Sequence, residues 1–115
     1  MNLKIYHNPR CSKSRAGLKV IEDAGKEVEI IKYLDSTPSF EELKSIIEKI
    51  GIKAIDLVRI KEKDWKENFK GKDLSDNQII QAMIDYPKLI ERPIVVLGDK
   101  AVLGRPVENI VEFIS

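Results

Sequence analysis

The residues best suited to chemistry lie together near the start of the chain, in the segment His-Asn-Pro-Arg-Cys-Ser-Lys-Ser-Arg at positions 7–15. This segment holds the only cysteine of the chain, Cys11, and the only histidine, His7. A cysteine attacks electrophiles as a thiolate, and nearby positive charge favours that form. Basic side chains precede and follow Cys11 within the segment. The pattern therefore indicates nucleophilic or redox chemistry at one sulfur atom.

The position of Cys11 between two expected elements supports this interpretation over a packing role. Free cysteine is commonly a small buried hydrophobe, but the neighbours of Cys11 are proline, arginine, serine and lysine, which do not build a core. An apolar strand is expected at 3–6 and a helix from about Ser12, so the thiol stands at a strand-to-helix junction. Backbone N–H groups without intrahelical partners and the positive end of the helix dipole are found at such a junction. We interpret Cys11 as a reactive thiol.

Three neighbours have candidate roles around this sulfur. His7 can act as a cation that lowers the pKa of the thiol, or it can cap or pack beneath the loop, and the sequence leaves both open. Ser14 lies one turn along the helix and can donate a hydrogen bond to the thiolate. Arg15 can add to the positive potential of the loop or be an ordinary cation on the helix surface.

The first elements of the chain form a βαβ unit that would position this loop. Residues 3–6 and 28–33 have strand patterns, and a helical pattern at 12–24 lies between them, with Gly25 as its C-terminal cap. Two strands joined by such a helix are expected to run parallel with a right-handed crossover.

Helices are expected through the middle of the chain. Capping boxes at Ser39–Glu42 and Ser75–Gln78 begin two helices, which end at Gly51 and before Pro87. A short helix is expected at 54–58. The highly charged run 60–73 is interpreted as a solvated surface segment pinned by Trp65 and Phe69 rather than as a binding patch.

Two more strands and a helix complete the chain. The apolar run 94–97 is typical of a central strand, Gly98-Asp99 forms a hairpin turn, and 100–103 returns as an edge strand. The last helix is expected to place four residues on one apolar face: Val107, Ile110, Val111 and Ile114.

The order βαβ…ββα predicts an α/β fold of the thioredoxin-like (glutaredoxin-like) type. We expect a mixed four-stranded sheet flanked by helices, with an all-helical insertion at about 38–86, in a single domain that spans 1–115. Thioredoxin-like folds place a cis-proline before the strand nearest the active loop. We therefore predict that the Arg92–Pro93 peptide bond is cis.

Composition restricts the possible partners. The chain has 115 residues and carries 20 basic and 19 acidic side chains, a formal charge of +1. This balance provides no field for nucleic acid or acidic membranes, so an anion site must be local. One cysteine cannot form an internal disulfide, which fits a reducing cytoplasm. No signal peptide, membrane span or metal site is expected.

These residues, together with three distant arginines, resemble the glutaredoxin-coupled arsenate reductase (ArsC) family of the ArsC/Spx superfamily. The family signature His-Asn-Pro-x-Cys-x-x-Ser-Arg is matched by His7, Asn8, Pro9, Cys11, Ser14 and Arg15. Further matches follow in the same order over essentially the whole chain: Tyr33-Leu34, Leu57-Val58-Arg59, Arg92-Pro93-Ile94-Val95-Val96 and Gly104-Arg105-Pro106. The chain departs from the family pattern at Arg10, where a small residue is frequent, and at Ser12-Lys13, where a glycine and a small hydroxyl residue are frequent.

The resemblance implies that Cys11 attacks arsenate, or a similar oxyanion, held by Arg59, Arg92 and Arg105. Guanidinium groups match the oxygens of a tetrahedral anion two at a time and neutralise the charge that would repel a thiolate. It further implies a Cys11–arsenic ester, attack by glutathione, release of arsenite, and a mixed disulfide that glutaredoxin resolves. Glutathione would be a co-substrate, and no bound cofactor is expected. The alternative for each arginine is a weak surface ion pair, most of all for Arg59 in its charged segment.

Two other functions remain open from the sequence. A glutathione-dependent thiol oxidoreductase without arsenate activity is compatible with Cys-x-x-Ser at 11–14. An Spx-like regulator that binds RNA polymerase is disfavoured, because serine at position 14 removes the Cys-x-x-Cys switch and the charge is near neutral. A phosphatase site of the Cys-x5-Arg type would need arginine at position 17, which is Gly17.

Overall fold

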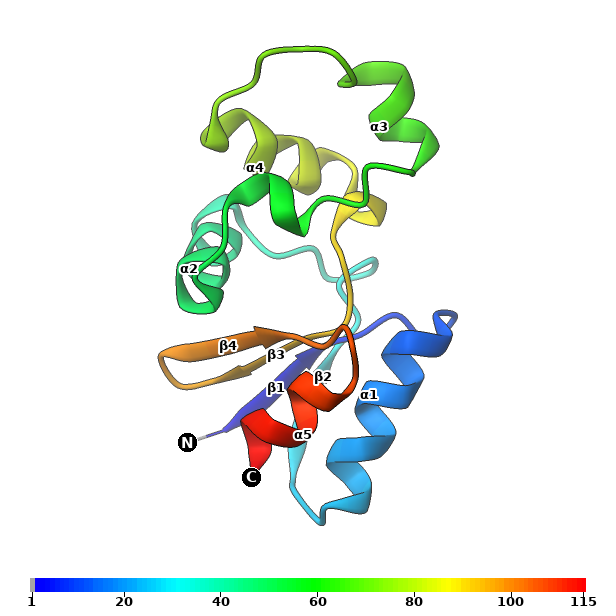
Figure 1. Cartoon of the computed structure of the whole chain (residues 1–115), viewed down its shortest axis with the longest axis vertical. Helices are drawn as coiled ribbons and strands as arrows, with labels where there is room; N and C mark the ends of the chain where they lie inside the picture. The colour runs from blue at the N-terminus through cyan, green and yellow to red at the C-terminus, as the bar shows by residue number, and fades with distance from the viewer. Residues whose placement is uncertain (1) are drawn as a thin grey trace. The chain divides into compact units, whose positions relative to one another are not determined.

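The computed structural model describes residues 2–115 and divides into two compact units (Figure 1). One unit comprises the residues up to 36 together with 92–115, and the other comprises 37–91. The second unit is helical, and it includes the range of about 38–86 over which the sequence predicts an all-helical insertion.

The first unit contains a mixed four-stranded sheet. Its strands are β1 (Leu3–Tyr6), β2 (Val28–Ile31), β3 (Ile94–Leu97) and β4 (Lys100–Leu103), in the order β2-β1-β3-β4. β1 and β2 are parallel, whereas β1–β3 and β3–β4 are antiparallel. The predicted fold class, with β3 central and β4 at an edge, is confirmed.

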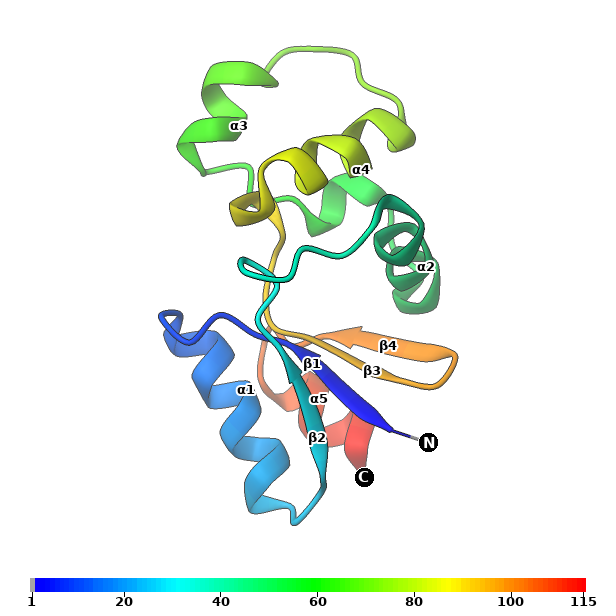
Figure 2. The same ribbon diagram turned by 180° about the vertical axis from the view of Figure 1, so that it is seen from behind.

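Two helices of this unit, α1 (Ser12–Asp23) and α5 (Glu108–Ile114), pack on one face of the sheet (Figure 2). Strand side chains alternate between faces, so one face of the sheet supplies its alternate residues to a core with the two helices. The core cluster consists of Leu3, Ile5, Ile21, Val95, Ile110 and Ile114. This core joins α1 and α5 to β1 and β3, and it thereby positions the helix whose N-cap residue is Cys11.

Two details of this unit differ from the sequence prediction. Val111 was expected on the buried face of the last helix but is 46% exposed, because the buried pair is Ile110 and Ile114, at i and i+4, and the next residue is rotated away from that face. β2 ends at Ile31 rather than at Tyr33, because the chain then turns, with the carbonyl of Lys32 accepting the N–H groups of Asp35 and Ser36. Tyr33 is nevertheless buried, with 1% of its surface exposed.

The second unit consists of helices and 3₁₀ turns. They are α2 (Phe40–Ile50), η1 (Ala54–Leu57), α3 (Lys63–Asn68), α4 (Asp76–Asp85) and η2 (Pro87–Leu89). The hydroxyl of Ser39 accepts the N–H of Glu42 at 3.1 Å, and Ser75 and Gln78 exchange both bonds of a capping box. α2 ends at Gly51, whose φ of 82° is in the left-handed region that glycine adopts without strain. The predicted starts and ends of α2 and α4 are confirmed.

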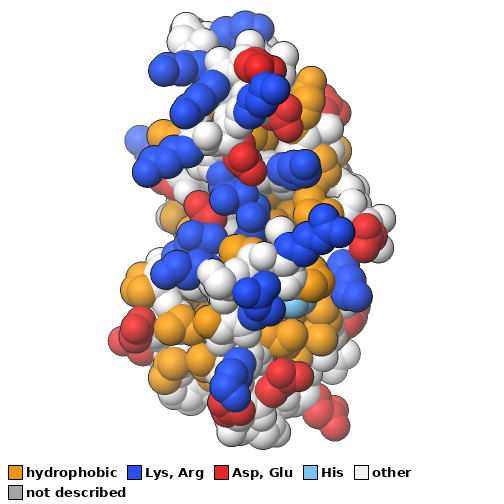
Figure 3. Space-filling model, turned by 90° about the vertical axis from the view of Figure 1, so that its right-hand side faces the viewer, with side chains coloured by type: hydrophobic (Ala, Val, Ile, Leu, Met, Phe, Trp, Pro, Cys, Tyr) orange, Lys and Arg blue, Asp and Glu red, His pale blue; other side chains and the backbone are white. Residues whose placement is uncertain are grey.

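The charged segment at 60–73 is largely exposed, as predicted, and contains the short helix α3. Trp65 is 8% exposed and stacks on Phe69, with ring centroids 5.4 Å apart; Phe69 meets the ring of Tyr86 edge-on. Lysine and arginine side chains are interspersed with acidic ones on the face drawn in Figure 3. Within residues 2–115, no helix combines the length and apolar character needed to cross a membrane.

Candidate active site

The loop between β1 and α1 is fixed by hydrogen bonds among its own residues. The carbonyl of Asn8 accepts the N–H of Cys11 at 3.0 Å, and its side-chain oxygen accepts the N–H of Arg10 at 3.0 Å. The guanidinium of Arg15 donates to the carbonyl of Pro9 at 2.9 Å. Arg15 therefore holds the loop as well as contributing charge. Cys11 is the N-cap residue of α1 and has extended backbone dihedrals, which places its sulfur beside the first N–H groups of the helix.

Buried polar residues lie beneath this loop and are hydrogen-bonded to one another. Ser14 has no exposed surface, and its hydroxyl oxygen accepts the N–H of Asn8 at 3.0 Å and is hydrogen-bonded to Nδ1 of His7 at 2.7 Å. Burial lowers the pKa of His7, and the charges of Lys32 and Arg15 lower it further. The neutral form is thus favoured, so of the two roles open for His7 the structure favours packing beneath the loop.

Two arginines from distant parts of the chain meet the sulfur of Cys11. Arg105 Nη2 lies 3.6 Å from Sγ, and Arg105 Nε donates to the carbonyl of Arg92 at 2.7 Å. Burial lowers the pKa of Arg92, but hydrogen bonds and charge interactions with Cys11 and Tyr33 outweigh it and raise that pKa above its usual value. Arg92 and Arg105, both predicted to bind the oxyanion, therefore meet at the thiol.

The surroundings of Cys11 lower its pKa. Partial burial of the thiol raises the pKa, but this effect is smaller than the combined effect of the backbone N–H groups of Ser14 and Lys13 and the guanidinium of Arg92. The expected hydrogen bond from Ser14 thus comes from its backbone N–H, while its hydroxyl is bonded to His7 and Asn8. The arrangement stabilises a thiolate beside two permanent cations, which suits attack on an anion.

Close packing beneath the site brings its segments together. The Arg92–Pro93 bond is cis, as predicted, and the Arg105–Pro106 bond is also cis, which was not predicted. A Cβ atom placed on Gly17 would lie 2.8 Å from Cδ1 of Ile110 and 2.9 Å from Cγ of Pro93. One placed on Gly104 would lie 2.6 Å and 2.8 Å from the same two atoms. Both glycines are therefore required for α1 and the loop before Arg105 to approach Pro93.

Arg59, the third predicted arginine, belongs to the helical unit. Its guanidinium makes an ion pair with Glu62 at 3.0 Å and a second with Glu91 at 3.7 Å, and its side chain is 27% exposed. The N–H of Arg59 donates to the carbonyl of Leu89 at 2.7 Å, which fixes its backbone. Its contact with an oxyanion stays a prediction.

Sequence reasoning missed Tyr33 and Asn109 as parts of the site. Tyr33 interacts with the guanidinium of Arg92. The side-chain amide of Asn109 donates to the carbonyls of Leu103 and Arg105 at 3.2 Å and 3.1 Å. A signal was available for Asn109, because asparagine is a poor helix former and stands inside a helix of mostly apolar and acidic residues.

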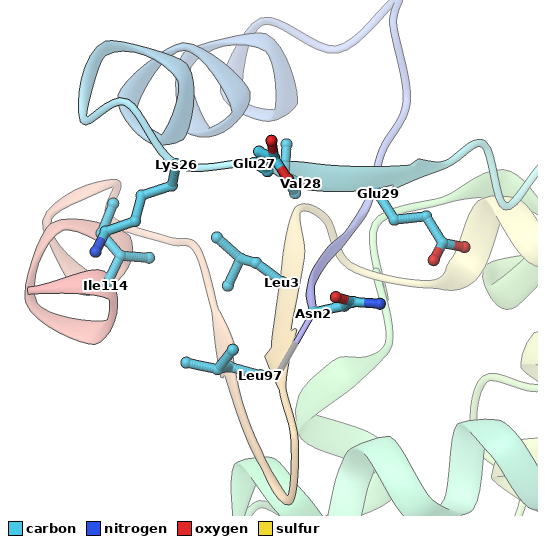
Figure 4. Close-up of a pocket in the computed structure, with 8 residues that line it drawn as sticks. All are labelled: Asn2, Leu3, Lys26, Glu27, Val28, Glu29, Leu97 and Ile114. Atoms are coloured by element: carbon cyan, nitrogen blue, oxygen red, sulfur yellow. The ribbon is translucent and has the colours of Figure 1, made fainter.

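A pocket of about 590 Å³ lies where β1 and β2 begin (Figure 4), whereas Cys11 follows the other end of β1. Its lining combines apolar side chains of the strands and α5 with a mixed rim: Asn2, Leu3, Lys26, Glu27, Val28, Glu29, Leu97 and Ile114. These residues include no nucleophile and only one cation, Lys26, so the pocket is not suited to the attack of a thiolate on a bound oxyanion. Among residues 2–115, no three His, Cys, Asp or Glu side chains gather as ligands for a metal ion.

Comparison with known proteins connects this geometry to a family. The model of the ArsC family matches residues 6–113. The chain belongs to the ArsC family. A protein of Neisseria meningitidis named arsenate reductase is 46% identical over 110 residues, which cover 94% of both chains.

Solved structures of ArsC relatives have the same fold. The structure of an arsenate reductase from Vibrio cholerae aligns with a TM-score of 0.92 at 46% identity and covers 97% of each chain. A putative arsenate reductase from Yersinia pestis aligns with a TM-score of 0.91 at 45% identity, over 96% of this chain and 99% of that one. The ArsC fold thus extends over nearly the whole of this chain.

Proposed function

We propose that this ArsC-family protein is an arsenate reductase in which Cys11 is the nucleophile. The observation that carries the proposal is the guanidinium of Arg105, 3.6 Å from the sulfur of Cys11, together with the hydrogen bond and charge of Arg92 at the same atom. A thiolate and two fixed cations in one place can attract an oxyanion and attack it. Relatives named arsenate reductase at 46% identity support arsenate as that oxyanion.

In the first step the thiolate of Cys11 displaces an oxygen of arsenate, which leaves as water after protonation. Arg92 and Arg105 hold the remaining oxygens and offset the repulsion between two negative reactants. Arg59 is proposed as a third ligand of the oxyanion. It would exchange its ion pairs with Glu62 and Glu91 for the substrate.

In the second step glutathione attacks the sulfur of the Cys11–arsenic ester. The S–S bond forms as the S–As bond breaks, and its electron pair reduces As(V) to As(III), which leaves as arsenite. Two thiols are oxidised to one mixed disulfide, which balances the two electrons gained by arsenic. Cys11 is the only cysteine in the chain, so the second thiol must come from outside. Glutaredoxin is the proposed acceptor of the glutathionyl group, and the reducing cytoplasm is the proposed location.

A coupled assay with arsenate, glutathione, glutaredoxin, glutathione reductase and NADPH tests this function. Arsenate-dependent NADPH oxidation is expected for the wild type and abolished by Cys11→Ser. Arg105→Ala is expected to lower kcat/KM for arsenate about 100-fold, as for loss of one oxyanion donor. Lys19→Ala is the matched control, because this cation lies on the exposed side of the same helix that carries Cys11. No arsenate-dependent turnover, with Cys11-dependent reduction of glutathione mixed disulfides instead, would reject the proposal in favour of a thiol oxidoreductase.

A further inference from the structure

Two sets of contacts hold the guanidinium of Arg105 at Cys11, one at the side chain of Arg105 and one at its backbone. At the side-chain end, Nε donates to the carbonyl of Arg92 and Nη2 reaches the sulfur. At the backbone end, the carbonyl of Arg105 accepts a hydrogen bond from Asn109 at 3.1 Å. A long side chain that must present one face to a small anion depends on both anchors, because movement of its backbone is transmitted to its donors.

Asn109 is bonded to both sides of the loop that carries Arg105. Its Nδ2 also donates to the carbonyl of Leu103, the last residue of β4, at 3.2 Å. Both acceptors are carbonyl oxygens, so only the amide nitrogen can make these two bonds. One half-buried amide therefore ties the end of β4, the backbone of Arg105 and the first turn of α5 together.

α5 itself is firmly placed. Ile110, the next residue, has no exposed surface and packs against Pro93, Gly17 and Gly104 so closely that neither glycine could carry a Cβ without displacing it. The position of the Asn109 amide is thus set by the same packing that brings Pro93 against Gly17 in the middle of α1.

We propose that Asn109 is a positioning residue for the oxyanion site, which orients Arg105 toward Cys11 by fixing the Leu103–Pro106 loop to α5. The amide of Asn109 bonds to backbone carbonyls and not to the sulfur, so it acts through Arg105. The role in turnover rests on the proposed arsenate reductase function, but the orientation of Arg105 at the thiol does not.

A double-mutant cycle between Asn109 and Arg105 tests the proposal. Asn109→Leu keeps the size of the side chain and suits a helix but removes both donors. It is expected to lower kcat/KM for arsenate about tenfold, below the 10²-fold that a misplacement of about 1 Å can cost. In the Arg105→Ala background the same substitution is expected to change kcat/KM by less than about twofold, because the group it positions is already gone. Equal losses in both backgrounds would overturn the proposal and assign Asn109 a general structural role.

Alkylation of Cys11 by iodoacetamide as a function of pH provides a readout that needs no turnover. Asn109→Leu and Arg105→Ala are each expected to move the midpoint of the profile to higher pH, and the double variant to match Arg105→Ala. Ser115→Ala, which removes a side-chain bond to the carbonyl of Val111 in the same helix, is the control and is expected to match the wild type. If Asn109→Leu fails to fold, Asn109→Ala, which also removes the donors and adds no charge, takes its place. A wild type inactive with arsenate would reject the proposed function, whereas an unmoved alkylation profile in Asn109→Leu would reject this inference.

Discussion

Gly104→Ala should weaken both the fold and the site, because it places a methyl group where Pro93 and Ile110 already lie. The added Cβ would be 2.6 Å from Cδ1 and 3.0 Å from Cγ1 of Ile110, and 2.8 Å from Cγ of Pro93. Contacts below 3.0 Å require movement, and Pro93 is a rigid ring while Ile110 is fully buried. The carbonyl of Pro93 also accepts the N–H of Gly104 at 2.8 Å, so the backbone cannot withdraw without losing a hydrogen bond.

The expected loss of stability follows from two opposing effects. Overpacking of a core costs about 1–3 kcal/mol, while replacing glycine by alanine restrains the unfolded chain and returns about 0.4–1 kcal/mol. These ranges leave a net loss of up to about 2.6 kcal/mol in the free energy of unfolding, and because two rigid or fully buried groups lie within 3.0 Å of the added Cβ we expect about 1–2 kcal/mol. For a chain of this length that corresponds to a fall in Tm of roughly 4–8 °C. Since residue 104 precedes Arg105, kcat/KM for arsenate should fall as well.

Ile110→Val makes this prediction specific, because it removes the Cδ1 atom that the new methyl group would meet. Alone it should cost about 0.5–1.5 kcal/mol. Combined with Gly104→Ala, the total cost should be smaller than the sum of the two by at least about 0.5 kcal/mol, as for residues in direct contact. Urea denaturation in reducing buffer measures all four corners of the cycle. Unchanged stability of Gly104→Ala, or strictly additive costs, would contradict the packing described beneath the site.

Three further predictions concern the loop itself. Ser14→Ala should lower the free energy of unfolding by about 2 kcal/mol, measured by urea denaturation, because it leaves Nδ1 of His7 and the N–H of Asn8 buried without the hydroxyl; a loss below about 0.5 kcal/mol would contradict this. Arg92→Met should raise the pKa of Cys11, which would be seen as a shift of the iodoacetamide alkylation profile to higher pH. An unshifted profile would show that Arg92 does not interact with the thiol. Because the folded-state pKa of Cys11 is lowered, its ionisation adds stability that is fully present above the unfolded value of about 8.5 and is lost as pH falls through the folded value. The free energy of unfolding of the wild type relative to Cys11→Ser should thus rise with pH across that window, and a difference independent of pH would contradict it.

Local signals predicted most of the secondary structure. The capping pair Ser75–Gln78 and the left-handed Gly51 mark helix ends through bonds and dihedrals that depend on neighbours in the sequence. The length of β2 was overestimated because the turn that ends it contains Tyr33 and Leu34, apolar residues that are also typical of strands, and it is closed by bonds from the N–H groups of Asp35 and Ser36 to the carbonyl of Lys32. The exposure of Val111 depends on which side of α5 faces the sheet. The apolar residues of this helix extend over more than one side, so their pattern does not show which of them is buried.

The sequence indicated the chemistry of the site but not its supports. Cys11 was recognisable from its neighbours, and Arg92 and Arg105 from family-like segments. The bond from Arg105 Nε to the carbonyl of Arg92, the fit of Gly17 against Pro93 and the two bonds of Asn109 all join residues far apart in the sequence. No pattern of residue types along one chain specifies such contacts.

Mass spectrometry of the intact protein after a single turnover tests whether Cys11 is the residue that reduces arsenate. The protein is mixed with glutathione, with or without arsenate, in the absence of glutaredoxin, and arsenite is quantified in the same sample. We expect one glutathione adduct at Cys11 that forms only with arsenate, with one arsenite released per adduct. An adduct that forms equally without arsenate, or arsenite released by Cys11→Ser, would contradict the assignment of Cys11 as the residue that reduces arsenate.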